Sequence, residues 1–433
     1  MVSVMGRLRI DPTNTYFIKD GKPFFLLSDT IWMAFQKMNL DAWEELVRTR
    51  REQGFNALQM SVLPVVHDNA LGKKDLFPFP MKNGMYDFSS PNNAYFDRAE
   101  QMLQIMRRYG MIPFLHLFWV DYIPDTRNAA RYPEATLPEA YIAPLTRYFV
   151  GRFKKYEPIY SVSGDTLFET ERVVSYYRKV FDVLQEEDPT GLTTMHLHPD
   201  GNPPEVLCAH PQYHFYAYQS AHNVSSEKGY GQSTMLRLSK LFREKTHKKP
   251  VVNTEPCYEG HGFGGRYGRF GSFDVRRAIW QSLLSGANAG ISYGAHGIWQ
   301  VYEAGDVFKN TAVSGMPYAW RTALNFEGAW DAGFAKWLYE TYRMEKLVPS
   351  GAYNARSDEL CFAVSDDGLA VMYLPYNDDV TLCMDLRDYR VQSIALQSKR
   401  MLTPELVRNQ TETTVLRGSC NEDMLIIAQK NGR

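Results

Sequence analysis

The chain has 433 residues, about three times the length of a typical domain, which allows one large barrel-sized domain or several smaller ones. A hydrophobic fraction of 44% and a charged fraction of 22% exclude an intrinsically disordered, collagenous or coiled-coil protein. The 48 basic and 49 acidic residues leave a net charge of −1 without a long run of either sign, so we expect neither nucleic acid nor a membrane among its partners.

Short apolar runs alternate with longer amphipathic segments over the first three quarters of the chain. The apolar runs predict buried strands at residues 24–28, 56–62, 112–118, 159–163, 193–197, 213–216, 250–254 and 289–292. The amphipathic segments predict helices at residues 41–53, 93–109, 139–155, 170–187, 233–245 and 275–285. This alternation is typical of an α/β protein and predicts a (β/α)8 TIM barrel over residues 1–345.

The pattern changes after the predicted barrel. Turn-forming Asp-Gly and Asn-Asp pairs separate short apolar runs at residues 361–365, 369–374, 380–386 and 424–428, with no helical segment between them. These runs predict a small antiparallel β-sandwich over residues 346–433. No polar linker precedes it, so we expect it to pack directly against the barrel as an accessory domain.

The five cysteines form no C-x-x-C pair, and their odd number argues against a disulfide framework or a thiolate zinc site. The N-terminal sequence MVSVMGRLRI lacks the apolar run of a signal peptide. We therefore expect a cytoplasmic protein with reduced thiols that needs neither a metal nor another cofactor. The sequence carries no signal for an oligomeric state.

Carboxylates and aromatic side chains collect just after the predicted strands. In a TIM barrel the carboxyl ends of all strands meet at one mouth, so residues distant in sequence can share a site there. Two carboxylates that face each other across the mouth, such as Asp165 and Glu255, are what glycoside hydrolysis requires. Tryptophan, tyrosine and histidine beside them suit a small carbohydrate substrate. The candidate binding residues at these positions are Asp29, Trp32, His116, Trp119, His196, Gln219, His222 and Tyr258.

Several of these segments resemble one family of enzymes. They are GKPFFLLSDTIW (21–32), QGFNALQMSVLP (53–64), PNNAYFDRAEQML (91–103), YSVSGD (160–165), QSAH (219–222) and PVVNTEPCYEG (250–260). In this order they resemble the apiosidase-like glycoside hydrolases, once catalogued as domain of unknown function 4038 and including glycoside hydrolase family 140. The resemblance covers about residues 7–345. The chain departs from it at Ser163, where relatives usually have glycine.

The resemblance implies a clan-A-like barrel in which Asp165 is the acid/base and Glu255 is the nucleophile. It also implies that Asp29, Trp32, Gln219 and His222 shape the sugar subsite. A direct attack by Glu255 predicts retention of the anomeric configuration, with the two carboxyl groups about 5–5.5 Å apart. Long loops at residues 67–90 and 121–137 could close a pocket. We therefore expect a retaining glycoside hydrolase that is exo-acting on short oligosaccharides or glycosides.

Three other interpretations use the same segments. His196 and His198 lie two apart, on one face of a strand, and could begin a metal site of the amidohydrolase type; the simpler role for His196 is to contact substrate or Glu255. A catalytically inactive carbohydrate-binding barrel would keep the aromatic residues but lose a carboxylate. The glycine-rich segment 260–265 matches the dinucleotide fingerprint G-x-G-x-x-G, but it follows the seventh predicted strand, which favours a loop over the substrate.

Overall fold

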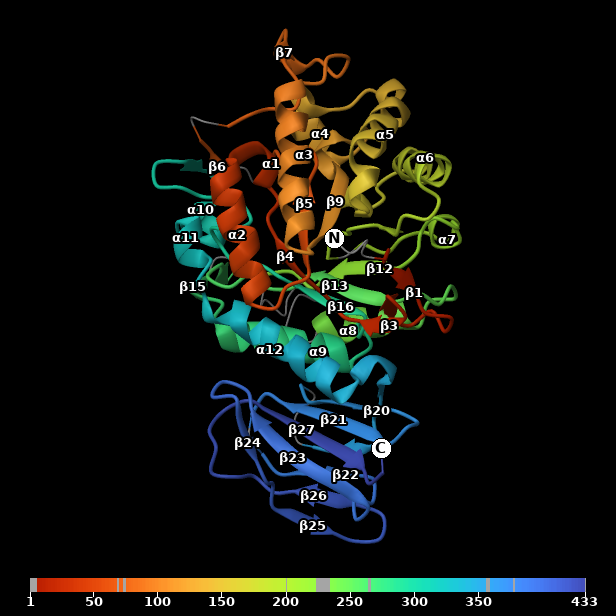
Figure 1. Cartoon of the computed structure of the whole chain (residues 1–433), viewed down its shortest axis with the longest axis vertical. Coiled ribbons are helices and arrows are strands. Elements are labelled where there is room, and N and C mark those ends of the chain that lie inside the picture. The colour runs from red at the N-terminus through yellow and green to blue at the C-terminus, as the bar shows by residue number, and fades with distance from the viewer. Residues whose placement is uncertain are drawn as a thin grey trace.

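A parallel eight-stranded sheet forms the centre of the molecule (Figure 1). The computed structural model describes residues 6–67, 70–72, 75–199, 201–222, 234–263, 266–355, 359–376 and 378–432. The strands are hydrogen-bonded in the order β11-β10-β9-β5-β4-β16-β13-β12. Because each step along this order joins parallel strands with helices around them, the predicted (β/α)8 TIM barrel is confirmed.

Each barrel strand comes from one of the predicted apolar runs. The strands are β4 (Leu26–Thr30), β5 (Ala57–Ser61), β9 (Ile112–Trp119), β10 (Ile159–Gly164), β11 (Thr193–Thr194), β12 (Tyr216–Gln219), β13 (Val251–Glu255) and β16 (Gly290–Tyr293). At the seam between β11 and β12, the backbone N–H of His214 donates to the carbonyl oxygen of Thr193 over 2.9 Å. This contact joins the two edge strands without a continuous ladder.

Two predicted strands have the wrong bounds. The first barrel strand begins at Leu26 because β3 (Lys22–Phe24) pairs with β2 (Phe17–Lys19) in a small sheet outside the barrel. The sixth strand, β12, begins at Tyr216, where the prediction places its end. Gln219 therefore belongs to the strand itself rather than to the loop after it.

Helices surround the barrel as the amphipathic segments predict. They are α2 (Leu40–Glu52), α3 (Asn93–Arg108), α5 (Glu139–Phe153), α6 (Glu171–Glu187), α8 (Thr234–Arg243) and α9 (Ser272–Leu284). Side chains of Asn39, Asn92 and Thr170 accept backbone N–H groups and so fix where three of them begin. A further helix, α12 (Glu327–Tyr342), was not predicted, because its apolar residues spread around the helix instead of forming one face.

The amino-terminal end of the barrel is filled by apolar side chains. Leu26, Ala57, Phe114 and Phe215 pack there against Phe17 of the small N-terminal sheet. Because this end is filled and covered, a ligand can enter the barrel from the opposite end, where the strands finish.

Residues after the barrel form two antiparallel sheets, as expected for a β-sandwich. The first contains β18 (Val348–Pro349), β20 (Cys361–Val364), β21 (Leu369–Leu374), β27 (Met424–Lys430), β23 (Tyr389–Ala395) and β24 (Arg400–Leu402). The second contains β19 (Tyr353–Asn354), β22 (Val380–Leu382), β26 (Thr413–Val415) and β25 (Leu406–Arg408). Apolar residues that include Phe362, Met372, Leu382 and Val415 form the core of this region.

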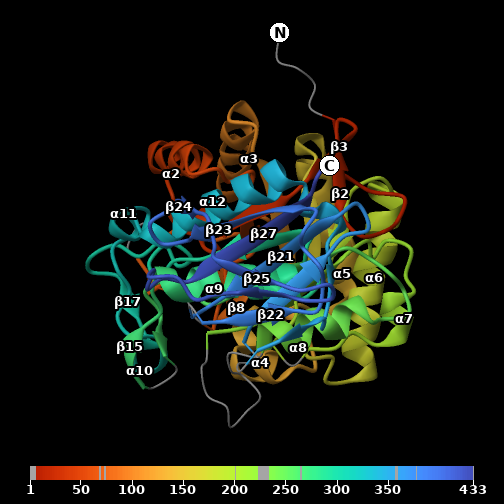
Figure 2. The same ribbon diagram turned by 90° about the horizontal axis from the view of Figure 1, so that it is seen from below.

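The sandwich packs directly against the barrel helices α9 and α12 (Figures 1 and 2). Arg276 of α9 is buried at this contact, where its guanidinium binds the Asp423 carboxylate at 2.8 Å and the Asp331 carboxylate at 2.8 Å. A buried arginine between two carboxylates fixes the orientation of the two parts. The division of the chain after residue 345 remains a prediction. Within the described part of the chain, no helix has both the length and the apolar character needed to cross a membrane.

Candidate active site

A cavity of about 230 Å³ opens at the carboxyl ends of the barrel strands. Seven of the ten candidate residues from the sequence line it: Trp32, Trp119, Asp165, Gln219, His222, Glu255 and Tyr258. They come from the ends of five different strands, so the fold gathers them from distant parts of the sequence. The cavity is therefore the candidate active site.

Asp165 follows β10 at the rim of the cavity. Its backbone is left-handed, with a φ of 54°, and its carboxylate accepts a hydrogen bond from the Gln219 side chain. The preceding residue must be glycine, because a Cβ atom at Gly164 would lie 1.8 Å from the indole of Trp119. About a quarter of the Asp165 side chain, 23%, remains exposed to the cavity. The carboxyl group is thus held in place yet open to a ligand.

Glu255 ends β13 and is more deeply buried. The His222 ring donates from Nε2 to the Glu255 carboxylate over 2.8 Å, because His222 Nδ1 accepts the backbone N–H of Tyr258 over 3.2 Å. Burial by itself would raise the pKa of Glu255, but its contacts with His196 and His222 outweigh burial and hold the pKa well below the ordinary value. Glu255 is therefore an ionised, preoriented carboxylate, the form that a nucleophile requires.

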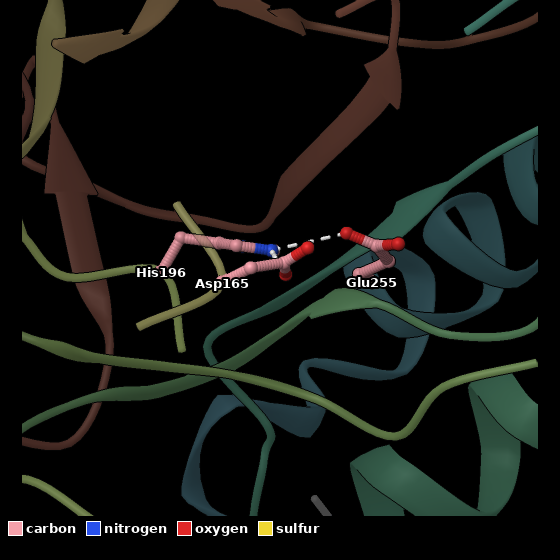
Figure 3. Close-up of side chains that lie close together, drawn as sticks. All are labelled: Asp165, His196 and Glu255. Carbon is pink, nitrogen blue, oxygen red and sulfur yellow. Dashed lines mark ion pairs between the residues drawn. The ribbon is translucent and has the colours of Figure 1, made fainter. Parts of the chain in front are cut away.

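The His196 ring nitrogen points toward the carboxyl groups of Asp165 and Glu255 (Figure 3). Its Nε2 is 3.0 Å from a Glu255 oxygen and 3.5 Å from an Asp165 oxygen, while Nδ1 is 3.1 Å from the Thr254 hydroxyl. Burial opposes the charged imidazolium, but the two carboxylates prevail and raise the pKa of His196 to about 9. The hydroxyl of Ser163, the residue that departs from the family pattern, donates to the His196 carbonyl oxygen over 2.8 Å. His196 is therefore a cation within ion-pair distance of both carboxylates.

The family is decided by the sequence match. The family described as "Apiosidase-like, catalytic domain" matches residues 12–346. The chain belongs to this apiosidase-like family. It is accordingly a glycoside hydrolase with a TIM-barrel catalytic region, as the resemblance of its segments 160–165 and 250–260 predicts.

Solved structures share the whole fold of this apiosidase-like enzyme. A protein described as a glycoside hydrolase aligns with a TM-score of 0.81 at 16% identity, covering 99% of this chain and 98% of its own. A glycoside hydrolase family 5 protein from Bacteroides vulgatus ATCC 8482 aligns with a TM-score of 0.83 at 18% identity, covering 99% and 94%. An endo-β-1,4-mannanase from Thermotoga petrophila aligns at 0.51 and 10% identity, covering 96% and 97%. Comparison with curated proteins gives no match.

Three candidate residues do not line the cavity: His196, which contacts Asp165 and Glu255, and Asp29 and His116. Asp29 is fully buried on the helix side of β4, where its carboxylate binds the Arg50 guanidinium of α2 at 2.5 Å. His116 is buried beneath the cavity floor, with its ring centroid 4.7 Å from Trp32 and 5.2 Å from His196. Burial holds the pKa of His116 well below its ordinary value, so its ring is neutral. It packs against the charged ring of His196. The structure therefore brings neither Asp29 nor His116 to the cavity surface.

Replacement of Asp29 is expected to affect stability rather than substrate binding. Asp29→Ala leaves the buried Arg50 cation without its partner, which costs about 3–5 kcal/mol of unfolding free energy. Urea unfolding of the wild type and the variant measures this loss, and Asp29→Ala with Arg50→Leu should recover part of it. A stable Asp29→Ala protein with a strongly raised KM would instead show that Asp29 contacts the sugar.

Ionisation of His196 predicts a dependence of stability on pH. Folding raises the pKa of His196 from 6.5 to about 9, so its stabilising contribution is complete below pH 6.5 and is lost as the pH rises through about 9. Melting temperatures measured from pH 6 to pH 10 should therefore fall more steeply for the wild type than for His196→Gln. His247→Gln, at a surface histidine, is the control and should keep the wild-type slope. Equal slopes for all three proteins would contradict a cationic His196.

Other cavity residues were not among the ten candidates, although the loops predicted over the site contain His67 and His261, and His198 belongs to the metal-site interpretation. They are Val65, His67, His198, Pro199, Ala221, His261 and Trp299. His67 lies with Nδ1 2.9 Å from the Asp121 carboxylate and Nε2 3.7 Å from Asp165. Trp299 follows the eighth barrel strand, so the rule used for the other strand ends would have found it, whereas His67 lies in a loop with no periodic signal. In the glycine-rich segment, Gly264 and Gly265 lie outside the described residues.

Proposed function

We propose that this apiosidase-like enzyme hydrolyses glycosides with retention, with Glu255 as the nucleophile and Asp165 as the acid/base. The observation that carries the proposal is the closeness of their carboxylates: an oxygen of each, together with a His196 ring nitrogen, lies within 4.8 Å of the others. Retaining enzymes place the two carboxyl groups about 5–5.5 Å apart, whereas inverting enzymes need about 6.5–9.5 Å to admit a water molecule. The spacing supports direct attack by Glu255.

In the first step, a Glu255 oxygen attacks the anomeric carbon while the proton of Asp165 passes to the glycosidic oxygen. The bond from the anomeric carbon to that oxygen breaks, the aglycone leaves as an alcohol, and an ester joins the sugar to Glu255. In the second step, Asp165 takes a proton from a water molecule whose oxygen attacks the same carbon. The ester bond breaks, which restores the Glu255 carboxylate and the Asp165 acid and releases the sugar with its original configuration.

The charge of His196 suits this cycle. In the proposed cycle, ionised Glu255 and cationic His196 form an ion pair at 3.0 Å before the attack. When Glu255 becomes an ester, Asp165 has given up its proton and replaces it as the partner of His196. His196 therefore balances the negative charge as it moves from one carboxylate to the other.

The size and walls of the cavity support exo-action. A volume of about 230 Å³ lies below the roughly 300–1,000 Å³ of sites for drug-sized ligands, which suits a single sugar unit. Trp32, Trp119 and Trp299 supply apolar ring surfaces, and His222 and Gln219 supply polar groups. A pocket of this kind accepts the end of a short oligosaccharide or a simple glycoside and is too small for the middle of a long chain.

The deciding experiment is to identify the anomer released first. A panel of aryl pyranosides and furanosides is screened, and the product of the substrate that is cleaved is followed by NMR before mutarotation. The expected first product has the configuration of the substrate. An inverted product would refute Glu255 as a nucleophile, because inversion requires that water attack the anomeric carbon directly.

One observation favours a second candidate, a metal-dependent barrel. Asp165, His196 and Glu255 are all ligand types for divalent metals, and one potential ligand atom from each lies within 4.8 Å of the others. If the glycosidase mechanism holds, dialysis against a chelator leaves kcat unchanged, and metal analysis finds less than one equivalent. Loss of activity on chelation that zinc restores would support the metal-dependent mechanism instead.

A further inference from the structure

A second and larger cavity lies beside the sugar cavity. Its volume is about 600 Å³. Its lining includes His67, Phe79, Met81, Tyr86, Tyr132 and Glu134. His67 lines this cavity and the sugar cavity alike, so the two adjoin at this side chain. The glycosidase mechanism leaves the second cavity without a role.

The walls of this cavity are mainly apolar and aromatic. Phe79 is buried and packs against Tyr86, with ring centroids 6.1 Å apart. Tyr86 ends the hairpin formed by β7 (Met81–Lys82) and β8 (Met85–Tyr86), which lies at the end of the molecule opposite the C-terminal sheets (Figure 1). Two apolar side chains at the lining remain solvent-exposed, Leu71 at 43% and Met81 at 55%. Exposed apolar side chains beside an aromatic cavity indicate a binding surface.

The cavity lies on the side of the acid/base. His67 Nε2 is 3.7 Å from Oδ2 of Asp165, whereas the Glu255 carboxylate contacts His196 and His222. The acid donates its proton to the oxygen of the leaving group, so the leaving group extends from the sugar cavity past Asp165. The part of a substrate that passes His67 therefore enters the second cavity.

We propose that this cavity binds the leaving group of the substrate and that this leaving group is an apolar aromatic aglycone, such as a polyphenol with two or three rings. The proposal rests on the glycosidase function proposed above. A volume of about 600 Å³ matches a drug-sized molecule rather than one more sugar unit. Phe79, Tyr86 and Tyr132 offer ring surfaces for stacking, and Glu134 and Asn310 offer acceptors for phenolic hydroxyls.

Binding of a free aglycone tests the site without any hydrolysis. A flavone is titrated into the wild type, Tyr86→Ser and Met81→Asp, and its Kd is measured by calorimetry. We expect each substitution to weaken binding about tenfold, which is the effect of about 1.4 kcal/mol. Met81 is exposed on a hairpin, so its variant folds even if Tyr86→Ser does not. Trp337→Ala, which removes an exposed aromatic ring from α12, is the control and should bind like the wild type.

Kinetics on matched substrates complete the test. A flavone glycoside and the methyl glycoside of the same sugar are compared, and each lining substitution is expected to lower kcat/KM about tenfold for the first substrate only. If, for every sugar of the aryl glycoside panel, neither glycoside is cleaved but the flavone still binds the wild type and not the variants, the aglycone site stands and the proposed mechanism of Asp165 and Glu255 fails. If the flavone does not bind, or binds the variants equally well, the aglycone site is overturned, whatever the outcome of hydrolysis.

Discussion

Glu255→Gln is expected to lower kcat at least about 10⁴-fold on any substrate that the wild type cleaves, because no carboxylate remains to attack the anomeric carbon. The amide keeps the shape of the side chain, and its carbonyl oxygen can still accept the Nε2–H of His222. Substrate binding should therefore persist. Initial rates together with calorimetric titration of the substrate measure the two properties separately.

Glu259→Gln is the matched control for this prediction. Glu259 lies four residues further along and outside the cavity, and it accepts hydrogen bonds from the Tyr293 hydroxyl over 2.7 Å and the Gly328 backbone N–H over 2.9 Å. Burial raises the pKa of Glu259 to about 7, so a neutral amide replaces a group that is already partly neutral at pH 7. Its kcat should stay within a few-fold of wild type. Wild-type rates in Glu255→Gln as well would exclude Glu255 as the nucleophile.

Small nucleophiles give a second measure of the role of Glu255. Glu255→Ala opens space at the anomeric carbon, and azide is expected to enter it and restore turnover with an activated aryl glycoside. The product should be a glycosyl azide of inverted configuration, since azide attacks once where Glu255 and water attack in succession. A rescued product of retained configuration would mean that another side chain is the nucleophile.

The gathering of Asp165 and Glu255 in one cavity could be predicted from the sequence, because it depends on two robust signals. Short apolar runs locate β10 and β13, and parallel strands of a barrel end at the same mouth. An error of two or three residues in a strand boundary does not change which end of the strand a following residue occupies. Gln219 shows this: the predicted bounds of β12 were three residues too early, and the Gln219 side chain still reaches Asp165.

The direction of a side chain near a strand end could not be predicted in the same way. Successive residues of a strand alternate between the barrel interior and the helix layer. In β4, Ser28 contacts Ser292 of a neighbouring strand, whereas Asp29 reaches Arg50 on helix α2. A shift of one residue decides between these directions, and because all five residues of β4 are buried, the sequence shows no alternation that would tell the two faces apart. The sequence rule therefore selects the right end of the strand without selecting the right face.

His67 shows the other source of error, which is tertiary placement of a loop. The residue lies in a segment with no apolar period, and nothing local to it indicates a partner. Its position beside Asp165 depends on the Asp121 carboxylate, 54 positions away, which lies 2.9 Å from its Nδ1. A contact of this kind between side chains of two loops is specified by the whole fold, so local patterns do not reveal it.

Asp165→Asn is expected to separate substrates by their leaving groups. Glycosides with alkyl or sugar leaving groups should lose about 10²–10⁴-fold in kcat/KM, because their oxygen cannot depart without a proton. A nitrophenyl or dinitrophenyl glycoside should lose less than about tenfold, since its leaving group is stable as an anion. The side-chain oxygen of asparagine can still accept the hydrogen bond from Gln219, so the geometry of the cavity is kept. Asp182→Asn, at a half-exposed carboxylate on α6, is the control and should cleave all substrates normally.

The same variant should also expose the covalent intermediate. Asp165 activates water in the second step, so its loss slows hydrolysis of the ester on Glu255 even when an activated leaving group makes the first step fast. A burst of nitrophenol followed by slow turnover is expected, and mass spectrometry of the quenched protein should find one sugar unit on the peptide that contains Glu255. Equal losses for all leaving groups, with no burst, would assign Asp165 to binding and leave the proton donor to be sought at His67, whose Nε2 lies 3.7 Å from Asp165.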